Sequence, residues 1–250
     1  MRSKVKHIIS HKKIPLLRSV VSWKDVEILE AGEKLVSLNG LHPDRISIEP
    51  QYFLQGIKDS MNECFVRETV AMMLYEASKL LPDGYKFIVW DSWRPIETQR
   101  AIFNRYKEKI WNQNPALSEE EVITSAQKYV SLPVLDEESP PPHSTGGAVD
   151  LSIIDQSDNY LDMGTYYDDF SKRAGTRYFE EKIEKGQNLS RKESVMLANR
   201  RLLFHTLTEV GFTNYPEEWW HYDYGNQFWA KIKGKSAVYG KMKIMAQPII

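Results

Sequence analysis

Cysteine is almost absent from this chain of 250 residues, in which Cys64 is the only one. A single thiol excludes an internal disulfide and a zinc site built from several cysteines, and it is typical of a reducing compartment such as the cytoplasm. Cys64 comes just before an apolar helical pattern. We therefore interpret it as a buried structural thiol rather than as a nucleophile, and we expect a cytoplasmic protein.

Long apolar runs and a basic surplus are also missing. No segment approaches the roughly 20 apolar residues that a membrane span needs. The net charge of -1 argues against nucleic acid as the main partner, because proteins that bind it usually carry clustered basic residues. The first 24 residues are a local exception, with seven Lys or Arg and no Asp or Glu, but they lack the continuous apolar stretch of a signal peptide. We interpret them as a solvated arm rather than as a membrane-surface or targeting segment.

Helical and strand-like patterns follow along the chain. Apolar residues recur every three or four positions from Val66 to Leu81, which predicts an amphipathic helix that Pro82 stops. The aromatic and β-branched run 85–91 predicts a strand, and the alternation over 147–154 predicts another.

Three further helices are predicted from their start and stop signals. Pro95 can occupy the first turn of one of them. Ser118 and Glu121 form a capping-box pattern for the next, which we expect to run to about residue 130. The third extends from about 191 to 210, where a glycine ends it.

The remaining segments decide the fold class. The proline- and acid-rich stretch 132–142 predicts a surface loop, and the aromatic stretch 218–224 is strand-like. Helices and strands are mixed without the steady βαβ alternation of a parallel sheet, so we predict an α+β fold.

Two of the six histidines have neighbours suited to metal chemistry. His143 opens the segment HSTGGAVD, which ends at Asp150, and its glycine pair allows a turn between the two side chains. With His221 they make a set of two His and one Asp, which leaves a zinc position open for water, as catalytic sites require. The same residues can instead be buried hydrogen-bonding groups without a metal. We interpret the other histidines as surface, loop or helix-packing residues: His7, His11, His42 and His205.

Glu218 and Arg94 are candidates for catalysis. Glu218 precedes His221 by three residues, and a carboxylate so placed can take a proton from a zinc-bound water, whose pKa falls to about 7. Arg94 follows a predicted strand, where loops often carry function, and it can donate to a carbonyl oxygen as negative charge develops. The ordinary alternative for Glu218 is a surface ion pair, and an Arg-Pro pair at the end of a strand carries little information by itself.

Four short motifs occur in a fixed order, and together they resemble the D-alanyl-D-alanine dipeptidases. They read Asp91-Ser-Trp-Arg94-Pro95, His143-Ser-Thr-Gly-Gly-Ala-Val-Asp150, Met163-Gly-Thr-Tyr-Tyr-Asp168 and Glu218-Trp-Trp-His221. The resemblance runs from about residue 50 to about 230. We therefore expect residues 1–45 to be an N-terminal extension and residues 46–250 to be a zinc dipeptidase domain.

The resemblance implies a fold and a metal site. The fold is a small antiparallel sheet flanked by helices, with the zinc in a cleft on the sheet. One zinc ion per chain would be bound by His143, Asp150 and His221.

The resemblance also implies a reaction, the hydrolysis of D-Ala-D-Ala or a closely related dipeptide to free amino acids, within cell-wall metabolism. Glu218 would be the general base, and Arg94 would polarise the scissile carbonyl. Asp168 would pair with the free amino group of the substrate, a small dipeptide.

Alternatives to this reaction stay open. The zinc scaffold also suits a carboxypeptidase or endopeptidase acting on peptidoglycan peptides, or a zinc-stabilised binding module without catalysis. One departure from the family concerns Pro141, which stands where the family often has Ser, so any contact from that hydroxyl is lost. The sequence leaves the oligomeric state open.

Overall fold

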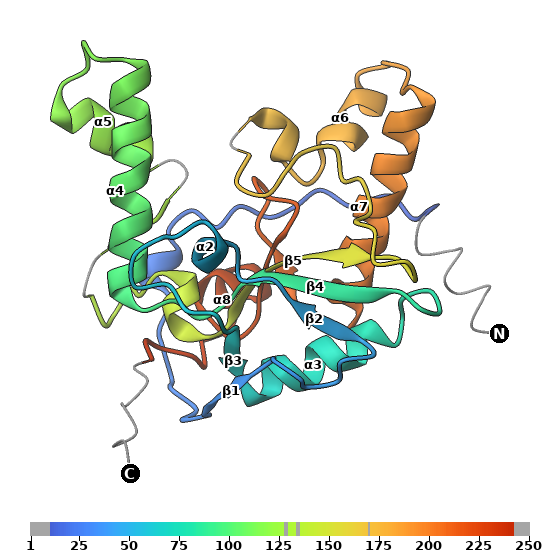
Figure 1. Cartoon of the computed structure of the whole chain (residues 1–250), viewed down its shortest axis with the longest axis horizontal. Coiled ribbons are helices and arrows are strands. Elements are labelled where there is room, and N and C mark those ends of the chain that lie inside the picture. Colours follow the sequence, from blue (N-terminus) through green and yellow to red (C-terminus); the bar gives the residue numbers. More distant parts are fainter. Residues whose placement is uncertain (1–10, 128–129, 134–135, 170, 243–250) are drawn as a thin grey trace.

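The computed structural model describes residues 11–127, 130–133, 136–169 and 171–242. Within these residues a five-stranded sheet forms the centre of the molecule (Figure 1). Its strands, in spatial order, are β2 (Ile46–Ile48), β4 (Lys86–Asp91), β5 (Ala148–Ile154), β7 (His221–Asp223) and β6 (Thr213–Asn214). The edge strand β2 runs parallel to β4, and the other pairs are antiparallel.

Two long helices complete the main core. α3 (Glu68–Ser78) and α7 (Arg191–Glu209) contact each other, and their apolar residues pack into one cluster with those of β4 and β5. Every residue of β5 is buried. The combination of a small, mostly antiparallel sheet with flanking helices confirms the predicted α+β class.

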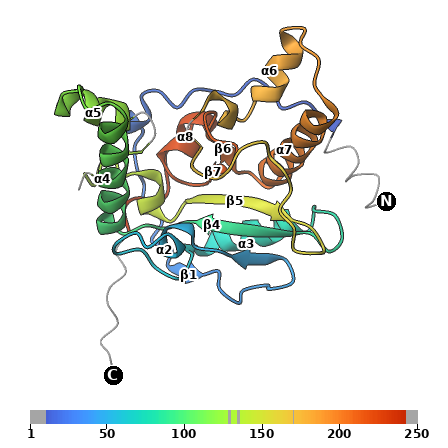
Figure 2. The ribbon, with the colours of Figure 1, turned by 45° about the horizontal axis from the view of Figure 1, so that its top comes forward.

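The other helices lie around this core. α4 (Ile96–Gln113) and α5 (Glu119–Ala126) stand together at one end of the sheet (Figures 1 and 2). The shorter helices are α2 (Gln51–Leu54), α6 (Tyr178–Glu184) and α8 (Gln227–Lys233), with 3-10 turns η1 (Trp23–Asp25), η2 (Pro142–Thr145) and η3 (Lys172–Ala174). No helix in the described parts of the chain is both long and apolar enough to cross a membrane.

Local signals predicted several elements well. Strands β4 and β5 lie where 85–91 and 147–154 were expected. Ser118 forms the predicted capping box with Glu121, although α5 ends at Ala126, short of residue 130. The helix expected at 191–210 is α7, and Gly211 follows its end with a left-handed φ of 111°.

The helix predicted from Val66 begins later than expected. Phe65–Arg67 form strand β3, which pairs with β1 (Leu35–Ser37) outside the central sheet. Val66 is fully buried in that strand, and a strand and a helix both accommodate one buried β-branched residue, so periodicity alone misplaced the boundary. The helix ends at Ser78, before Pro82.

The aromatic stretch 218–224 is only partly a strand. Its strand residues are His221–Asp223, whereas Trp219 and Trp220 lie in the turn before them. The predicted surface loop 132–142 is wrong at its end, because Pro140, Pro141 and Pro142 are buried and lead into η2.

The solvated arm expected at the N-terminus is wrong at Ile14, although most of residues 11–24 are exposed as predicted; His7 and the rest of residues 1–10 lie outside the described residues. Ile14 is fully buried, its backbone N–H donates to Glu180 and its carbonyl accepts from Arg177. His205, on α7, bonds to the carbonyl of Lys12 and is therefore a packing residue.

Candidate active site

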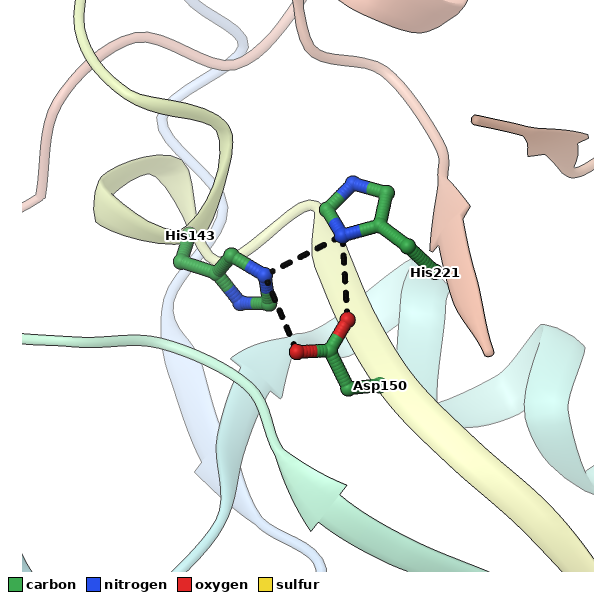
Figure 3. Close-up of side chains that lie close together, drawn as sticks. All are labelled: His143, Asp150 and His221. Carbon is green, nitrogen blue, oxygen red and sulfur yellow. Dashed lines mark hydrogen bonds and ion pairs between the residues drawn. The ribbon is translucent and has the colours of Figure 1, made fainter. Parts of the chain in front are cut away.

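Strand register brings the candidate metal ligands together. Asp150 on β5 lies directly opposite Asp91 of β4 and His221 of β7. His143 approaches from η2, and the left-handed Gly146 (φ 73°) turns the chain from η2 toward β5. Figure 3 shows the side chains of His143, Asp150 and His221 converging on one point.

The distances among these three residues are short. His143 Nε2 lies 3.2 Å from His221 Nδ1 and 3.5 Å from Asp150 Oδ2. The other Asp150 oxygen, Oδ1, lies 3.0 Å from His221 Nδ1. One ligand atom from each residue falls within 4.8 Å of the others, and all three residues are buried. The sequence-predicted set is thus assembled in space.

The outward nitrogens of both imidazoles already have partners. His143 Nδ1 lies 2.7 Å from the carbonyl oxygen of Ser92, so the N–H at this position donates to it. His221 Nε2 lies 3.1 Å from Asp223 Oδ1, an oxygen that also accepts from Asn226 at 2.6 Å. Outer partners of this kind fix the tautomer of a metal-binding histidine.

In the neutral imidazoles, the inward nitrogens His143 Nε2 and His221 Nδ1 would therefore carry lone pairs that face each other. Such a pair attracts a positive charge, either a proton or a metal ion. Burial alone would raise the pKa of Asp150, but His143 and His221 outweigh it and hold that pKa well below the usual range. Burial alone would lower the pKa of His221, but Asp223 and Asp150 outweigh it and raise that pKa. Two imidazoles and an ionised carboxylate fit a divalent metal ion.

Glu218 and Arg94 both lie close to this group. Glu218 Oε2 is 3.9 Å from His221 Nδ1, and its side chain is 17% exposed. Arg94 Nη2 is 3.9 Å from Asp150 Oδ2. The Arg94 guanidinium is held by Asp91, at 2.5 Å from Nε, and by Gln99, at 2.8 Å from Nη1.

A single cavity of about 100 Å³ joins all of the sequence-predicted site residues. Asp168 lines it and accepts a hydrogen bond from Tyr52 at 3.3 Å. The backbone of Asp168 is left-handed, with a φ of 57°, a conformation that a non-glycine residue seldom adopts. Pro141, the departure from the family pattern, is also in the cavity wall. The remaining candidates in the wall are Arg94, His143, Asp150, Glu218 and His221.

Two carboxylates in the cavity wall have raised pKa values. Burial raises the pKa of Glu218 to about 8; His221 opposes this, and Asp150 adds to it. Burial likewise raises the pKa of Asp168 to about 7, with Asp150 acting in the same direction and Arg94 against it. A divalent cation bound nearby would lower both values, because it stabilises the ionised forms.

Sequence reasoning left several residues of the site without a role. Asp91 was quoted only as part of a motif, yet its Oδ2 also lies 3.1 Å from His143 Nδ1. Asp223 could have been found, because residues two apart on a strand share a face, and it follows His221 by two. Tyr167, which donates to Asp150 at 3.0 Å, was likewise only part of a quoted motif, whereas Tyr52 carries no local signal.

Two residues that the sequence set aside are structural. Cys64 is buried, and burial raises the pKa of its thiol well above the usual value, which makes it a poor nucleophile. His42 stacks on Tyr75 with ring centroids 3.7 Å apart.

Comparisons with known proteins bear on the family of the chain. A family model described as D-Ala-D-Ala dipeptidase matches residues 33–237. The D-alanyl-D-alanine dipeptidase of Synechocystis sp. is 29% identical over 222 residues, which cover 82% of this chain and 87% of the relative. The enzyme of the same name from Enterococcus faecalis is 27% identical over 172 residues, covering 65% of this chain and 74% of the relative.

Two further matches cover less or are more distant. The D-alanyl-D-alanine dipeptidase of Escherichia coli is 26% identical over 140 residues, which cover 56% of this chain and 55% of the relative. The solved structure of VanYB in complex with D-alanine-D-alanine has a TM-score of 0.35 and 18% identity, and the match covers 72% of this chain and 84% of that one.

Proposed function

The chain belongs to the D-Ala-D-Ala dipeptidase family of peptidases, and on that premise we propose that it uses one zinc ion to hydrolyse D-Ala-D-Ala, or a closely related dipeptide, to free amino acids. The observation that carries the proposal is the convergence of three metal-ligand side chains, a carboxylate and a guanidinium on one small cavity.

The proposed zinc ligands are His143 Nε2, Asp150 and His221 Nδ1. These two nitrogens face inward, because the other ring nitrogens, His143 Nδ1 and His221 Nε2, are hydrogen-bonded to Ser92 and Asp223. When bound, zinc supplies a Lewis acid to such a site. The same donor set also suits other divalent metals, so the choice of zinc is part of the proposal.

Glu218 is the proposed general base. It takes a proton from the water that attacks the scissile carbonyl, and it returns that proton to the leaving amino group as the C–N bond breaks. Its position 3.9 Å from a proposed ligand nitrogen supports this role. A pKa raised toward neutrality also suits a group that must both accept and donate a proton near pH 7.

Arg94 and Asp168 are proposed to bind two different groups of the substrate, the scissile carbonyl and the free ammonium. The Arg94 guanidinium, held in place by Asp91 and Gln99, donates to the carbonyl oxygen as it gains negative charge. The ionised carboxylate of Asp168 pairs with the substrate ammonium. An N-acylated peptide lacks that charge, so Asp168 favours a free dipeptide over a longer cell-wall peptide. A reduced, buried Cys64 suits the cytoplasm as the proposed compartment.

The test compares the wild type with Glu218→Gln on D-Ala-D-Ala and on L-Ala-L-Ala, each with and without a chelator. We expect chelator-sensitive cleavage of the D,D form by the wild type. Glu218→Gln should lower kcat by about a hundredfold or more while keeping stoichiometric zinc, because the side-chain volume is retained and the base is removed. Cleavage of neither dipeptide by the zinc-loaded wild type would refute the proposed substrate, and an unchanged kcat would remove Glu218 from the mechanism.

A further inference from the structure

The turn that carries His143 is held from behind by a fully buried arginine outside the cavity wall. Arg67, the last residue of β3, has no exposed surface. Its Nε donates to the carbonyl of Thr145 at 2.7 Å, and its backbone N–H donates to the carbonyl of Gly146 at 3.0 Å. Both acceptors lie within three residues of His143.

All five N–H donors of the Arg67 guanidinium have an acceptor. Beside Thr145, Nη1 donates to Glu30 Oε1 at 2.9 Å and to the Glu33 carbonyl at 2.7 Å. Nη2 donates to Glu30 Oε2 at 3.1 Å and to the Gly240 carbonyl at 3.0 Å. Arginine is the only side chain that offers this fork, so the site requires arginine and not merely a positive charge.

The acceptors come from both ends of the described chain. Glu30 also accepts from the Gly240 backbone N–H at 2.6 Å. Burial alone would raise the pKa of Glu30, but hydrogen bonds from Gly240 and Arg67 outweigh it and lower that pKa. Glu30 is thus an ionised partner that links the N-terminal segment 26–31 to the C-terminal segment 237–242.

Strand β1 and the C-terminal segment also contact the turn directly. A Cβ on Gly146 would lie 2.5 Å from Leu35 Cδ2, so β1 packs closely against the turn. The backbone N–H of Met242 donates to the carbonyl of Ser144 at 2.9 Å. The turn therefore has few ways to move without breaking contacts made by residues far away in the sequence.

We propose that Arg67 and Glu30 are positioning residues for the metal centre: they fix the turn 143–146, and through it the ligand nitrogen of His143. The proposal rests on the proposed metal site. It assigns the segments 26–31 and 237–242 a role in holding the turn that carries His143. Partners behind a metal ligand typically change metal affinity by about 10- to 100-fold when they are removed.

The chain offers a matched control pair. Arg201 donates to both oxygens of Glu180 at 2.7 Å, and Glu180 is as deeply buried as Arg67. This pair joins α7 to α6 and to the backbone of His11 rather than to the His143 turn. In this pair, too, the arginine donates to both oxygens of one carboxylate, here through Nε and Nη2. The pair therefore serves to separate a loss of stability from a loss of metal positioning.

The experiment measures zinc affinity by competition with a chromophoric chelator, well below the melting temperature, for Arg67→Lys, Arg201→Lys and the wild type. The visible absorption of the cobalt-substituted proteins reports ligand geometry in parallel. We expect Arg67→Lys to weaken zinc binding by at least about tenfold and to alter the cobalt spectrum. Arg201→Lys should lower the melting temperature and leave zinc affinity and the spectrum unchanged.

Equal zinc affinity in Arg67→Lys and the wild type would overturn the proposal even if the melting temperature falls. If Arg67→Lys does not fold, Glu30→Gln against Glu180→Gln provides the same comparison with a smaller change of shape. Failure of the wild type to bind zinc at all would instead refute the metal site, and the positioning role with it.

Discussion

At the scale of single residues, the site buries two carboxylates whose ionised forms are destabilised by burial. Burial raises the pKa of Asp168 to about 7 and that of Glu218 to about 8. A carboxylate whose pKa is higher in the folded than in the unfolded state binds its proton more tightly when folded. Its contribution to stability is therefore full below pH 4 and is lost as the pH rises through about 7 or 8.

The loss of stability on ionisation predicts that Asp168→Asn is stabilised relative to the wild type at high pH but not at low pH. In chelator-treated protein, the melting temperature of the variant relative to the wild type should rise between pH 5 and pH 8, because the amide cannot ionise. Asp158→Asn is the control, since Asp158 also has a left-handed backbone (φ 59°) but a side chain that is 70% exposed. Differential scanning calorimetry at several pH values tests this. A difference that does not change with pH would show that Asp168 is not the group being titrated.

At the scale of elements, the link between η2 and β5 depends on one conformation. Gly146 has a φ of 73°, and Gly186 has almost the same value, 72°. Their surroundings differ: a Cβ on Gly186 would meet nothing within 4 Å, whereas on Gly146 it would lie 2.5 Å from Leu35 Cδ2. The two glycines separate the effect of backbone strain from that of packing.

Alanine at the two positions should therefore have unequal effects. Gly186→Ala should cost about 1–2 kcal/mol, the price of a left-handed non-glycine residue. Gly146→Ala should cost more and should weaken zinc binding, because either the turn or the Leu35 side chain must shift. Denaturant unfolding and zinc competition measure both effects, and Leu35→Ala should restore part of the loss in the double variant. Equal costs at the two glycines would contradict the close packing of the turn.

At the scale of the whole molecule, the apolar residues form a main core and smaller clusters. The main core joins the sheet to α3 and α7. A separate cluster joins α4 and α5 to Tyr52 and includes Phe103 and Ala126. Figure 2 shows α4 and α5 at the end of the sheet, and Gln99 and Gln127, within and just after these helices, line the cavity. We therefore expect the helical pair to open at a lower free energy than the sheet.

Amide hydrogen exchange should distinguish the helical pair α4 and α5 from the sheet. In the wild type, amides of α4 and α5 should exchange faster than those of β4 and β5, since regions with fewer buried contacts open at lower free energy. Phe103→Ala should accelerate exchange in α4 and α5 only, and raise KM. Phe87→Ala, at a fully buried position of β4, should accelerate it throughout. Uniform acceleration by Phe103→Ala would show that the molecule unfolds as one unit.

Sequence alone determined the features that depend on neighbours a few residues apart. The capping box at Ser118, the alternation of β5 and the end of α7 are local, because helix caps and strand patterns act within one or two turns of chain. The site residues were predicted by the order of four short motifs, which needs no structure. The division at residue 45 stays a prediction.

Tertiary structure decided what depends on residues far apart. The register that sets Asp91 and His221 opposite Asp150 is fixed by pairing between strands, and no short segment contains it. Val66 lies in a strand because β1 pairs with it, and Ile14 is buried because Glu180 and Arg177 bond its backbone. Arg67, which donates to Thr145 in the His143 turn, also donates to Glu30 and Gly240, which are 37 and 173 residues away from it. Such contacts form only when the whole chain has folded, since a local pattern cannot encode its distant partner.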